Sequence, residues 1–329
     1  MSEAHDKGGG NRAPELPLPS LQPKPHVMGA TEYGLILLQS MLWGSQFFFV
    51  GVVKAELQPW AMGVLRLLPA LVVLFTVMAI FRVRLPGQIR DWWLFLPFAA
   101  LNNAVPFYFL VLGQREVTGG IAAIFNATAP LFTLVLAHFF LNDERLSWRR
   151  VFGVLVGIAG IGVLTGLSGA TGSYVAQAYL LAGASCYAMA NVYARKFLIG
   201  HHAFAMATMQ MLLALVISLA AFLAFELGPE TKAPSMNAFI GVMAMGFLGS
   251  GFASLCHFTI LKRAGATNAI LVTIILPVTP IVLGFIFLGE TIGIREIAGG
   301  MIIALALLII DGRVLRWFRR DRGQSGDAR

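Results

Sequence analysis

The sequence predicts an all-α integral membrane protein with about ten transmembrane helices in two inverted five-helix repeats. Three observations predict this fold. Apolar residues make up 57% of the chain and charged residues only 12%, with a mean hydropathy of +0.77. The apolar runs continue unbroken for about 20 residues, as helical spans require, whereas the strands of a barrel would alternate in segments of about 10. The third observation is the distribution of basic residues among successive loops.

Ten apolar runs have the length and composition of membrane spans. Their connections are short, and several contain the Gly, Pro or Asn residues typical of turns. The runs are residues 33–53, 60–81, 92–112, 117–140, 150–168, 175–195, 203–225, 237–260, 267–289 and 296–312. In the ninth run, we expect Thr273, Pro277 and Pro280 to interrupt the helix and to free backbone carbonyls toward a cavity.

The two ends of the chain lack the composition of a packed core. Residues 1–32 are polar and rich in Pro and Gly, and they contain no apolar segment of the kind found in signal peptides. We interpret them as a disordered cytoplasmic tail, with either Met1 or Met28 as the initiator. Residues 33–168 then form the first repeat, residues 175–312 the second, and residues 313–329 a basic cytoplasmic tail.

The basic residues alternate from one side of the predicted membrane to the other. With a cytoplasmic N-terminus, the inside segments hold 19 of the 24 Lys and Arg residues and the outside segments hold four. The positive-inside rule then places both termini in the cytoplasm and requires an even number of spans. Only Arg66 lies within a span. This asymmetry accounts for the net charge of +8, and because no basic patch is interleaved with aromatics we expect no nucleic-acid partner.

The two halves of the chain resemble each other in order and spacing. An offset of 144 residues aligns residues 63–72 with 207–216, and slightly larger offsets align Pro130 with Pro277 and Glu144 with Glu290. Each half contains five spans, which is an odd number, so the second half must be inverted relative to the first. Inverted repeats are an architecture of membrane transporters, whose solute site lies near the midplane between the repeats.

Several short motifs appear at corresponding places in the ten-span pattern. They are Trp43-Gly44-Ser45, Leu65-Arg66, Pro130-Leu131-Phe132, Asp143-Glu144-Arg145-Leu146, Pro277 with Phe287-Leu288-Gly289-Glu290, and the glycine-rich helices that begin at Gly153 and Gly299. With these motifs, residues 33–312 resemble the drug/metabolite transporter superfamily, and specifically its EamA type with two five-helix repeats. One departure is the turn Leu141-Asn142-Asp143-Glu144, where the family more often has Leu-Gly-Glu.

The resemblance implies a transporter of the bacterial inner membrane whose cavity is lined by helices one, three, four, six, eight and nine. The amide and aromatic side chains inside the spans favour amino acids or similar zwitterionic and neutral metabolites as solutes, and we expect their export by alternating access. Direction, solute and coupling ion stay open, as does a homodimer. The lipid bilayer and the solute are the expected partners.

Polar side chains inside spans are costly, and each is therefore a candidate for function. The candidates for solute binding are Trp43, Gln46, Arg66, Asn102, Asn103, Tyr108, Asn126, Tyr187, Asn191 and Thr273. The alternative for each is a hydrogen bond between helices. For Arg66 the alternatives are attraction of an anionic solute and a structural role, in which the side chain extends to the membrane surface or satisfies helix-end carbonyls. We expect the second helix, including Leu74, to be peripheral.

The alternatives to a metabolite exporter differ in the residues they need. No Asp or Glu lies deep in a span, which disfavours a multidrug or cation efflux carrier because such a carrier needs a buried carboxylate. A membrane-embedded enzyme would need clustered acids or histidines at one membrane face, and no such motif appears. We therefore expect neither catalysis nor a cofactor or metal. A solute sensor stays open, although sensing alone does not require duplicated halves.

Two further features are interpreted as packing. His138 and His257 lie near predicted cytoplasmic ends of spans, where interfacial polar packing is favoured over a proton relay. The spacing of Gly153 and Gly157, repeated at Gly162 and Gly166, allows close approach of helices. It does not reveal whether the contact lies within one chain or between two.

Overall fold

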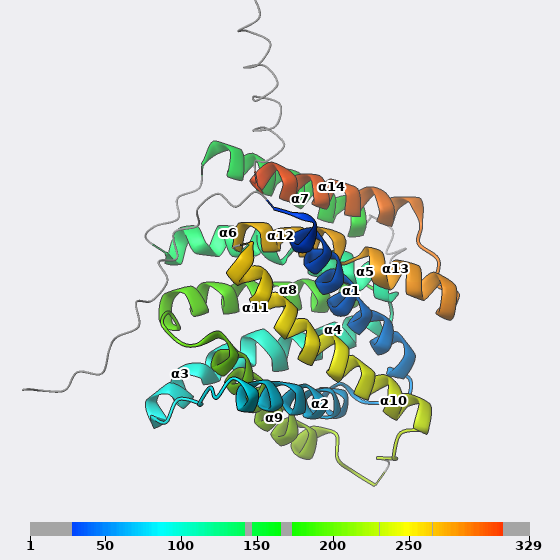
Figure 1. Ribbon diagram of the computed structural model, residues 1–329. Coiled ribbons are helices and arrows are strands. Elements are labelled where there is room, and N and C mark those ends of the chain that lie inside the picture. The colour runs from blue at the N-terminus through cyan, green and yellow to red at the C-terminus, as the bar shows by residue number, and fades with distance from the viewer. Residues whose placement is uncertain (1–27, 142–146, 166–172, 230, 265, 312–329) are drawn as a thin grey trace, which may run out of the picture.

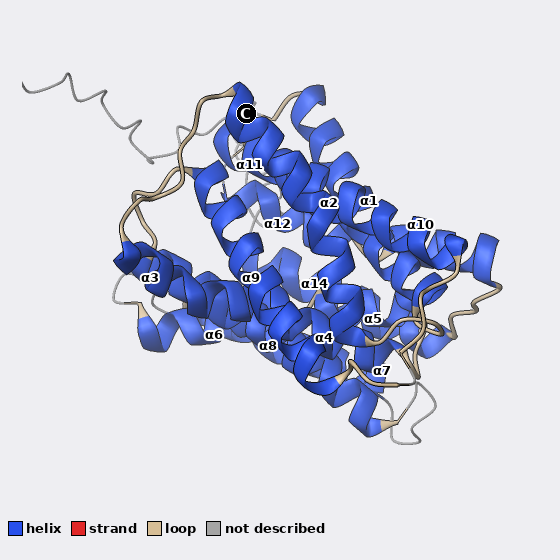
Figure 2. Cartoon of the chain, turned by 90° about the horizontal axis from the view of Figure 1, so that it is seen from below, coloured by secondary structure: helices blue, strands red, loops and turns tan. Residues whose placement is uncertain are grey.

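The computed structural model describes residues 28–141, 147–165, 173–229, 231–264 and 266–311. All regular structure in these ranges is helical, as Figures 1 and 2 show. Eight helical segments have the length and apolar composition needed to cross a membrane, and two further helices of 24 and 18 residues complete the predicted ten. The predicted tails, apart from residues 28–32, and the turn at 142–146 lie outside the described residues.

The first half of the chain forms five spans, two of which are divided. They are α1 (Ala30–Val53), α2 (Pro59–Ile80), the third span made of α3 (Ile89–Ala99), the π-helical η1 (Ala100–Ala104) and α4 (Val105–Gln114), the fourth made of α5 (Gly119–Asn126) and α6 (Ala129–Phe140), and α7 (Trp148–Thr165). Pro130 follows the break between α5 and α6, and Pro106 lies at the start of α4.

The second half repeats this pattern, including the two divided spans. Its elements are α8 (Tyr174–Phe197), α9 (Ala203–Phe225), the third span made of α10 (Met236–Ala244), the π-helical η2 (Met245–Phe252) and α11 (Ala253–Arg263), the fourth made of α12 (Ala266–Ile275), α13 (Val278–Leu283) and η3 (Gly284–Leu288), and α14 (Ile294–Asp311). The break before Val278 confirms the predicted interruption of the ninth span at Pro277. η1 and η2 thus occupy the middle of corresponding spans.

Below, the end of the molecule that carries the connection from α1 to α2 is called the outer end, because the charge pattern predicts that it faces away from the cytoplasm. The opposite end is called the inner end. In Figure 1, α7 and α14 lie side by side at one edge of the molecule, and α2 and α9 pack together at the opposite edge. Helix α1 runs between them and contacts η2, α11 and α13.

The expectation that the second helix is peripheral is wrong. Helix α2 packs against α9 on one side and η2 on another. Leu74 is only 1% exposed, in a buried cluster with Leu67 and Ala70. The burial of α2 could not be predicted from the sequence, because apolar residues lie on all sides of this helix. Such a helix has no polar stripe that would distinguish the face packed against protein from the face exposed to lipid.

The glycines of α7 serve contacts within one chain. A Cβ at Gly153 would meet Ile310 of α14, and one at Gly157 would meet Leu131 of α6. The glycine spacing at Gly153 and Gly157 therefore serves helix contacts within one chain. Gly162 instead faces open space, and Gly166 lies outside the described residues.

Carboxylates from distant segments bind helix N-termini at the outer end. Glu226, after α9, accepts hydrogen bonds from the backbone N–H groups of Trp60 and Ala61 at 2.9 Å each. Glu56, after α1, accepts from the backbone and hydroxyl of Ser235 at 2.7 and 2.8 Å, and Ser235 caps α10. A helix N-terminus carries positive partial charge, so these acids stabilise it. Each half thereby caps a helix of the other half.

Candidate functional site

Four hydrogen bonds, linked to one another through neighbouring residues of the backbone, cross the molecule at the level of the two π-helical segments. The set begins on α9, where the Gln210 side chain accepts a hydrogen bond from the Asn102 amide at 2.7 Å. Asn102 belongs to η1, so this contact joins a helix of the second half to the third span of the first. Gln210 is the repeat counterpart of Arg66. We call the connected set Gln210, Asn102, Asn103, Arg66, Ser250, Gly249 and Gln46 the central hydrogen-bond chain.

Arg66 is the centre of this chain. Its side chain is 4% exposed, and one terminal nitrogen donates to the Ser250 hydroxyl in η2 at 3.1 Å. The other terminal nitrogen donates to the backbone oxygen of Asn103 in η1 at 3.3 Å. The guanidinium carbon also lies 3.8 Å from the centre of the Phe107 ring. The proposal that Arg66 extends to the membrane surface is therefore wrong, since it binds both π-helical segments in the interior.

The chain ends on α1. The Gln46 amide donates to the backbone oxygen of Gly249, next to Ser250, at 2.6 Å. A π-helical turn shifts backbone carbonyls away from the α-helical bonding pattern, which lets them accept from side chains. Asn103 in η1 and Gly249 in η2 are two such acceptors. Residues of α1, η1, α9 and η2, which come from both halves, are thus linked in one set of polar contacts around Arg66 of α2.

Glycines in η2 permit these close approaches. A Cβ at Gly246 would collide with the backbone oxygen of Arg66 and the ring of Pro69, and one at Gly249 would collide with the Gln46 side chain. Without side chains at these positions, η2 lies directly against α1 and α2. The sequence therefore builds the interior contact from small residues, as is usual between membrane helices.

Asn126 and Tyr187 face a narrow crevice beside this chain. The crevice lies between α4, α5 and α8 and is otherwise mainly apolar, with Pro106, Leu110 and Leu180 among its walls. Asn126 is the last residue of α5, next to the break before α6. Pro106 on the crevice wall precedes Phe107, the ring that packs on the Arg66 guanidinium, so the crevice lies beside the charged centre of the chain.

Trp43 lies about one helical turn from Gln46 on α1. Its ring centre is 5.0 Å from that of His257 on α11. The Nδ1 atom of His257 and both amide atoms of the fully buried Gln39 have no hydrogen-bond partner among the described residues. His257 therefore packs inside the helix bundle. Thr273, half-buried in α12, lies in the span before the break at Pro277.

Two predicted site residues lie apart from the central chain. Tyr108 stacks on Trp60 with ring centres 4.5 Å apart, and both line an outer groove of about 450 Å³ with Arg115 and Glu226. Asn191 is exposed, and its amide lies 3.5 Å from the hydroxyl of Thr133 on α6. Asn102, by contrast, is bonded to Gln210 of α9.

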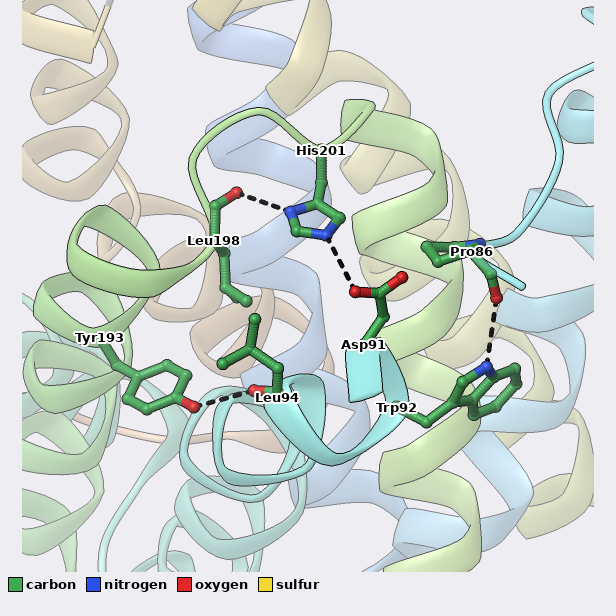
Figure 3. A network of polar contacts seen from close by, with 7 residues as sticks. All are labelled: Pro86, Asp91, Trp92, Leu94, Tyr193, Leu198 and His201. Atoms are coloured by element: carbon green, nitrogen blue, oxygen red, sulfur yellow. Dashed lines mark hydrogen bonds and ion pairs between the residues drawn. The ribbon is translucent and has the colours of Figure 1, made fainter. Parts of the chain in front are cut away.

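A second network of polar contacts lies at the inner end, and Figure 3 shows it from close by. His201, before α9, lies 3.9 Å from the Asp91 carboxylate at the start of α3 and 3.2 Å from the backbone oxygen of Leu198. The hydroxyl of Tyr193 donates to the backbone oxygen of Leu94 at 2.9 Å. These contacts hold α3 against the turn between α8 and α9.

Sequence reasoning missed three members of the central chain, which are Gly249, Ser250 and Gln210. The glycine-rich stretch 246–251 that contains Gly249 and Ser250 signals close helix contact. Gln210 aligns with Arg66 at the offset of 144 residues. Its polarity inside a span was a sufficient signal, by the same argument that selected Asn102.

The fold and this arrangement define a multi-pass, all-helical membrane protein with duplicated halves that share one interior polar centre. The model of the EamA-like transporter family matches residues 30–166 and 175–311, one match in each half. The chain therefore belongs to the EamA-like transporter family, which confirms the resemblance and the internal duplication.

Similar proteins match most of the length of the chain. The "Uncharacterized inner membrane transporter YedA" of Escherichia coli (strain K12) is 25% identical over 295 residues, which cover 86% of this chain and 92% of the relative. The "Probable terminal-alkyne amino-acid exporter" of Streptantibioticus cattleyicolor is 26% identical over 290 residues, which cover 85% of this chain and 93% of the relative. A crystal structure with 18% identity and a TM-score of 0.62, over 84% of this chain and 96% of the other, shows likeness of fold alone.

Proposed function

We propose that the protein exports small polar metabolites such as amino acids across the bacterial inner membrane, by alternating access to a midplane site between its two halves. The central hydrogen-bond chain is the observation that carries this proposal. It joins η1 of the first half to η2 of the second through Arg66. In inverted-repeat transporters, solute binds near the midplane at interrupted helices, where backbone and polar side chains face a cavity.

The chemistry of the surrounding residues suits a small polar solute. Asn126 and Tyr187 offer an amide and a phenol at a mainly apolar crevice, and Trp43 adds an aromatic wall on the α1 side. A solute that leaves water needs such replacement donors and acceptors. Two relatives, one named as an inner membrane transporter and one as an amino-acid exporter, support the location and the solute class.

The divided spans supply a means for the two halves to move. The third and fourth spans of each half change helix type or break near their middle, at η1, at η2, and before Ala129 and Val278. Such points let the outer and inner parts of one span tilt separately. In this proposal, the central hydrogen-bond chain keeps the binding site at a fixed depth in the membrane. The outer and inner ends of these spans then move apart in turn, so that the site opens first to one side and then to the other.

Transport by purified protein in liposomes tests the proposal. The wild-type protein should move at least some members of a radiolabelled panel of amino acids, and Trp43→Ala and Asn102→Ala should transport them more weakly. Loss of one contact that leaves a polar group of the solute unpaired lowers affinity roughly 5- to 150-fold. Rates are normalised to folded protein, because loss of packing also lowers abundance.

Leu68→Ala is the matched control, because Leu68 lies on α2 but is 45% exposed toward the surroundings of the helix bundle. It should transport like the wild type. A wild-type protein that moves no amino acid of the panel would refute the proposed solute class. Normal rates in both Trp43→Ala and Asn102→Ala would move the site elsewhere.

A further inference from the structure

Arg66 is a buried cation whose hydrogen-bonding capacity is only partly used. Its two terminal nitrogens bond to neutral acceptors, the Ser250 hydroxyl and the Asn103 backbone oxygen. The third nitrogen, Nε, is buried and has no hydrogen-bond partner among the described residues. None of the contacts described for Arg66 involves a carboxylate. Since a guanidinium carries five N–H donors, the edge formed by Nε and a neighbouring terminal nitrogen is left available.

An uncompensated charge inside a membrane span is unfavourable unless a partner binds it. Phe107 covers one face of the guanidinium at 3.8 Å, which shields the charge from water on that side. The planar donor edge of arginine matches the two oxygens of a carboxylate, and this bidentate pairing is stronger than a bond to a neutral acceptor. The vacant edge therefore has the geometry for a carboxylate.

The number of charges favours a monoanion over a phosphate. Arg66 is the only Lys or Arg in the middle of a described span, because the others lie at span ends or in connections. One guanidinium neutralises one carboxylate, whereas a phosphate near neutral pH would leave a further negative charge buried. Pro106 lines the crevice that contains Asn126 and Tyr187, and the next residue, Phe107, packs on the Arg66 guanidinium. The crevice is closed in this structure and Nε is buried, so a solute reaches both only when the surrounding spans move apart, as alternating access requires.

We infer that the transported solutes carry a carboxylate and that Arg66 binds it through its Nε edge, while the crevice at Asn126 and Tyr187 receives the rest of the solute. This inference rests on the transport function proposed above and narrows its substrate class. It assigns Arg66 a binding role in addition to its role in joining η1 to η2.

Pairs of probes that differ only in the carboxylate test the inference. Uptake into proteoliposomes is measured for L-leucine, L-methionine and L-phenylalanine and for their three amides. The wild-type protein should prefer the acids over the amides by about tenfold or more, as expected for one charged hydrogen-bonded pair. Arg66→Gln should lose this preference and move acid and amide at similar rates. Arg66→Lys, which keeps the charge without the planar edge, should retain a reduced preference for the acids.

The outcomes separate the two proposals. If the wild-type protein moves neither acids nor amides, the proposed function is wrong for amino acids and the inference falls with it. If it moves both equally well, the function stands and the inference is wrong. If folded Arg66→Gln protein loses both equally, Arg66 serves only to join η1 and η2. If Arg66→Gln does not accumulate in the membrane, the inference is tested by how strongly the wild type and Arg66→Lys prefer amino acids over their amides. An Arg66→Lys variant with the full wild-type preference would contradict binding of the carboxylate by the planar edge of Arg66.

Discussion

Leu74 and Leu68 show how far two identical residues on one helix can differ in environment. Both belong to α2, yet Leu74 is 1% exposed and Leu68 is 45% exposed. Leu74→Ala should lower the free energy of unfolding by about 2–5 kcal/mol, because it removes buried contacts and leaves a cavity. Leu68→Ala should change it by about 0.5 kcal/mol or less. Thermal unfolding of both variants in detergent checks this, and equal losses would contradict the burial of α2.

The Glu116 carboxylate is expected to stabilise the folded protein at neutral pH and to lose this effect in acid. Its carboxylate accepts from the backbone of Ser173 at 3.0 Å, at the start of α8. Hydrogen bonds from the side chain and backbone of Ser173 lower the pKa of Glu116 below its ordinary value of 4.5. A lowered folded-state pKa stabilises the protein fully above the unfolded value, and this contribution disappears as pH falls through the lower folded value.

The measurement compares the unfolding temperatures of the wild type and Glu116→Gln from neutral pH to about pH 3. The wild type should be more stable from neutral pH down to 4.5, and the two curves should converge in more acidic solution, where the protonated acid resembles the amide. A difference that persists unchanged into acid would show that the charge of Glu116 is not responsible.

At the level of residues, sequence reasoning found part of the polar centre. Gln46, Arg66, Asn102 and Asn103 were selected because polar groups inside spans are costly, and the structure joins all four in the central hydrogen-bond chain. That they bind solute stays a prediction. The direction in which each side chain points could not be predicted, because it depends on how α1, α2 and α9 rotate against η1 and η2.

At the level of elements, the ten spans followed from composition, whereas their irregularities mostly did not. Pro277 predicted the break between α12 and α13, because proline removes a helical hydrogen bond. The π-helical segments η1 and η2 leave no such mark, since a shift of backbone bonding by one residue barely alters a pattern that is apolar on all sides. Only the glycine-rich sequence of η2 hints at its close packing.

Gly246→Ala tests the close packing of η2. The added methyl group would collide with the backbone oxygen of Arg66, so η2 and α2 must move apart. We expect a loss of about 1–3 kcal/mol in stability from overpacking, with a parallel loss of transport. Gly162→Ala is the matched control, because Gly162 has open space around it and alanine is the better helix former by about 1 kcal/mol. Unfolding temperature and transport are measured for both, and a neutral Gly246→Ala would show that η2 can repack.

For the whole molecule, the duplication could be predicted because corresponding residues keep their order across both halves. The distribution of basic residues further predicts that both termini lie in the cytoplasm. Reporter fusions ending after residue 57 and after residue 88 should report the outside and the inside, respectively. These positions lie in the connections from α1 to α2 and from α2 to α3. The reverse pattern would overturn the assignment of inner and outer ends.

The exchange of helix caps between Glu56 and Glu226 bears on where this protein can open. Glu226 caps the N-terminus of α2, and Glu56 binds Ser235 at the N-terminus of α10. If the connection between α1 and α2 separated from the connection between α9 and α10, both helix N-termini and both carboxylates would lose these partners at the same time. The outer ends of α1, α2, α9 and α10 should therefore travel together and act as a hinge. A distance between Ala55 and Met236 that changes on addition of solute would contradict this. If the protein works by the proposed alternating access, the parts that move against each other then do not coincide with its two duplicated halves.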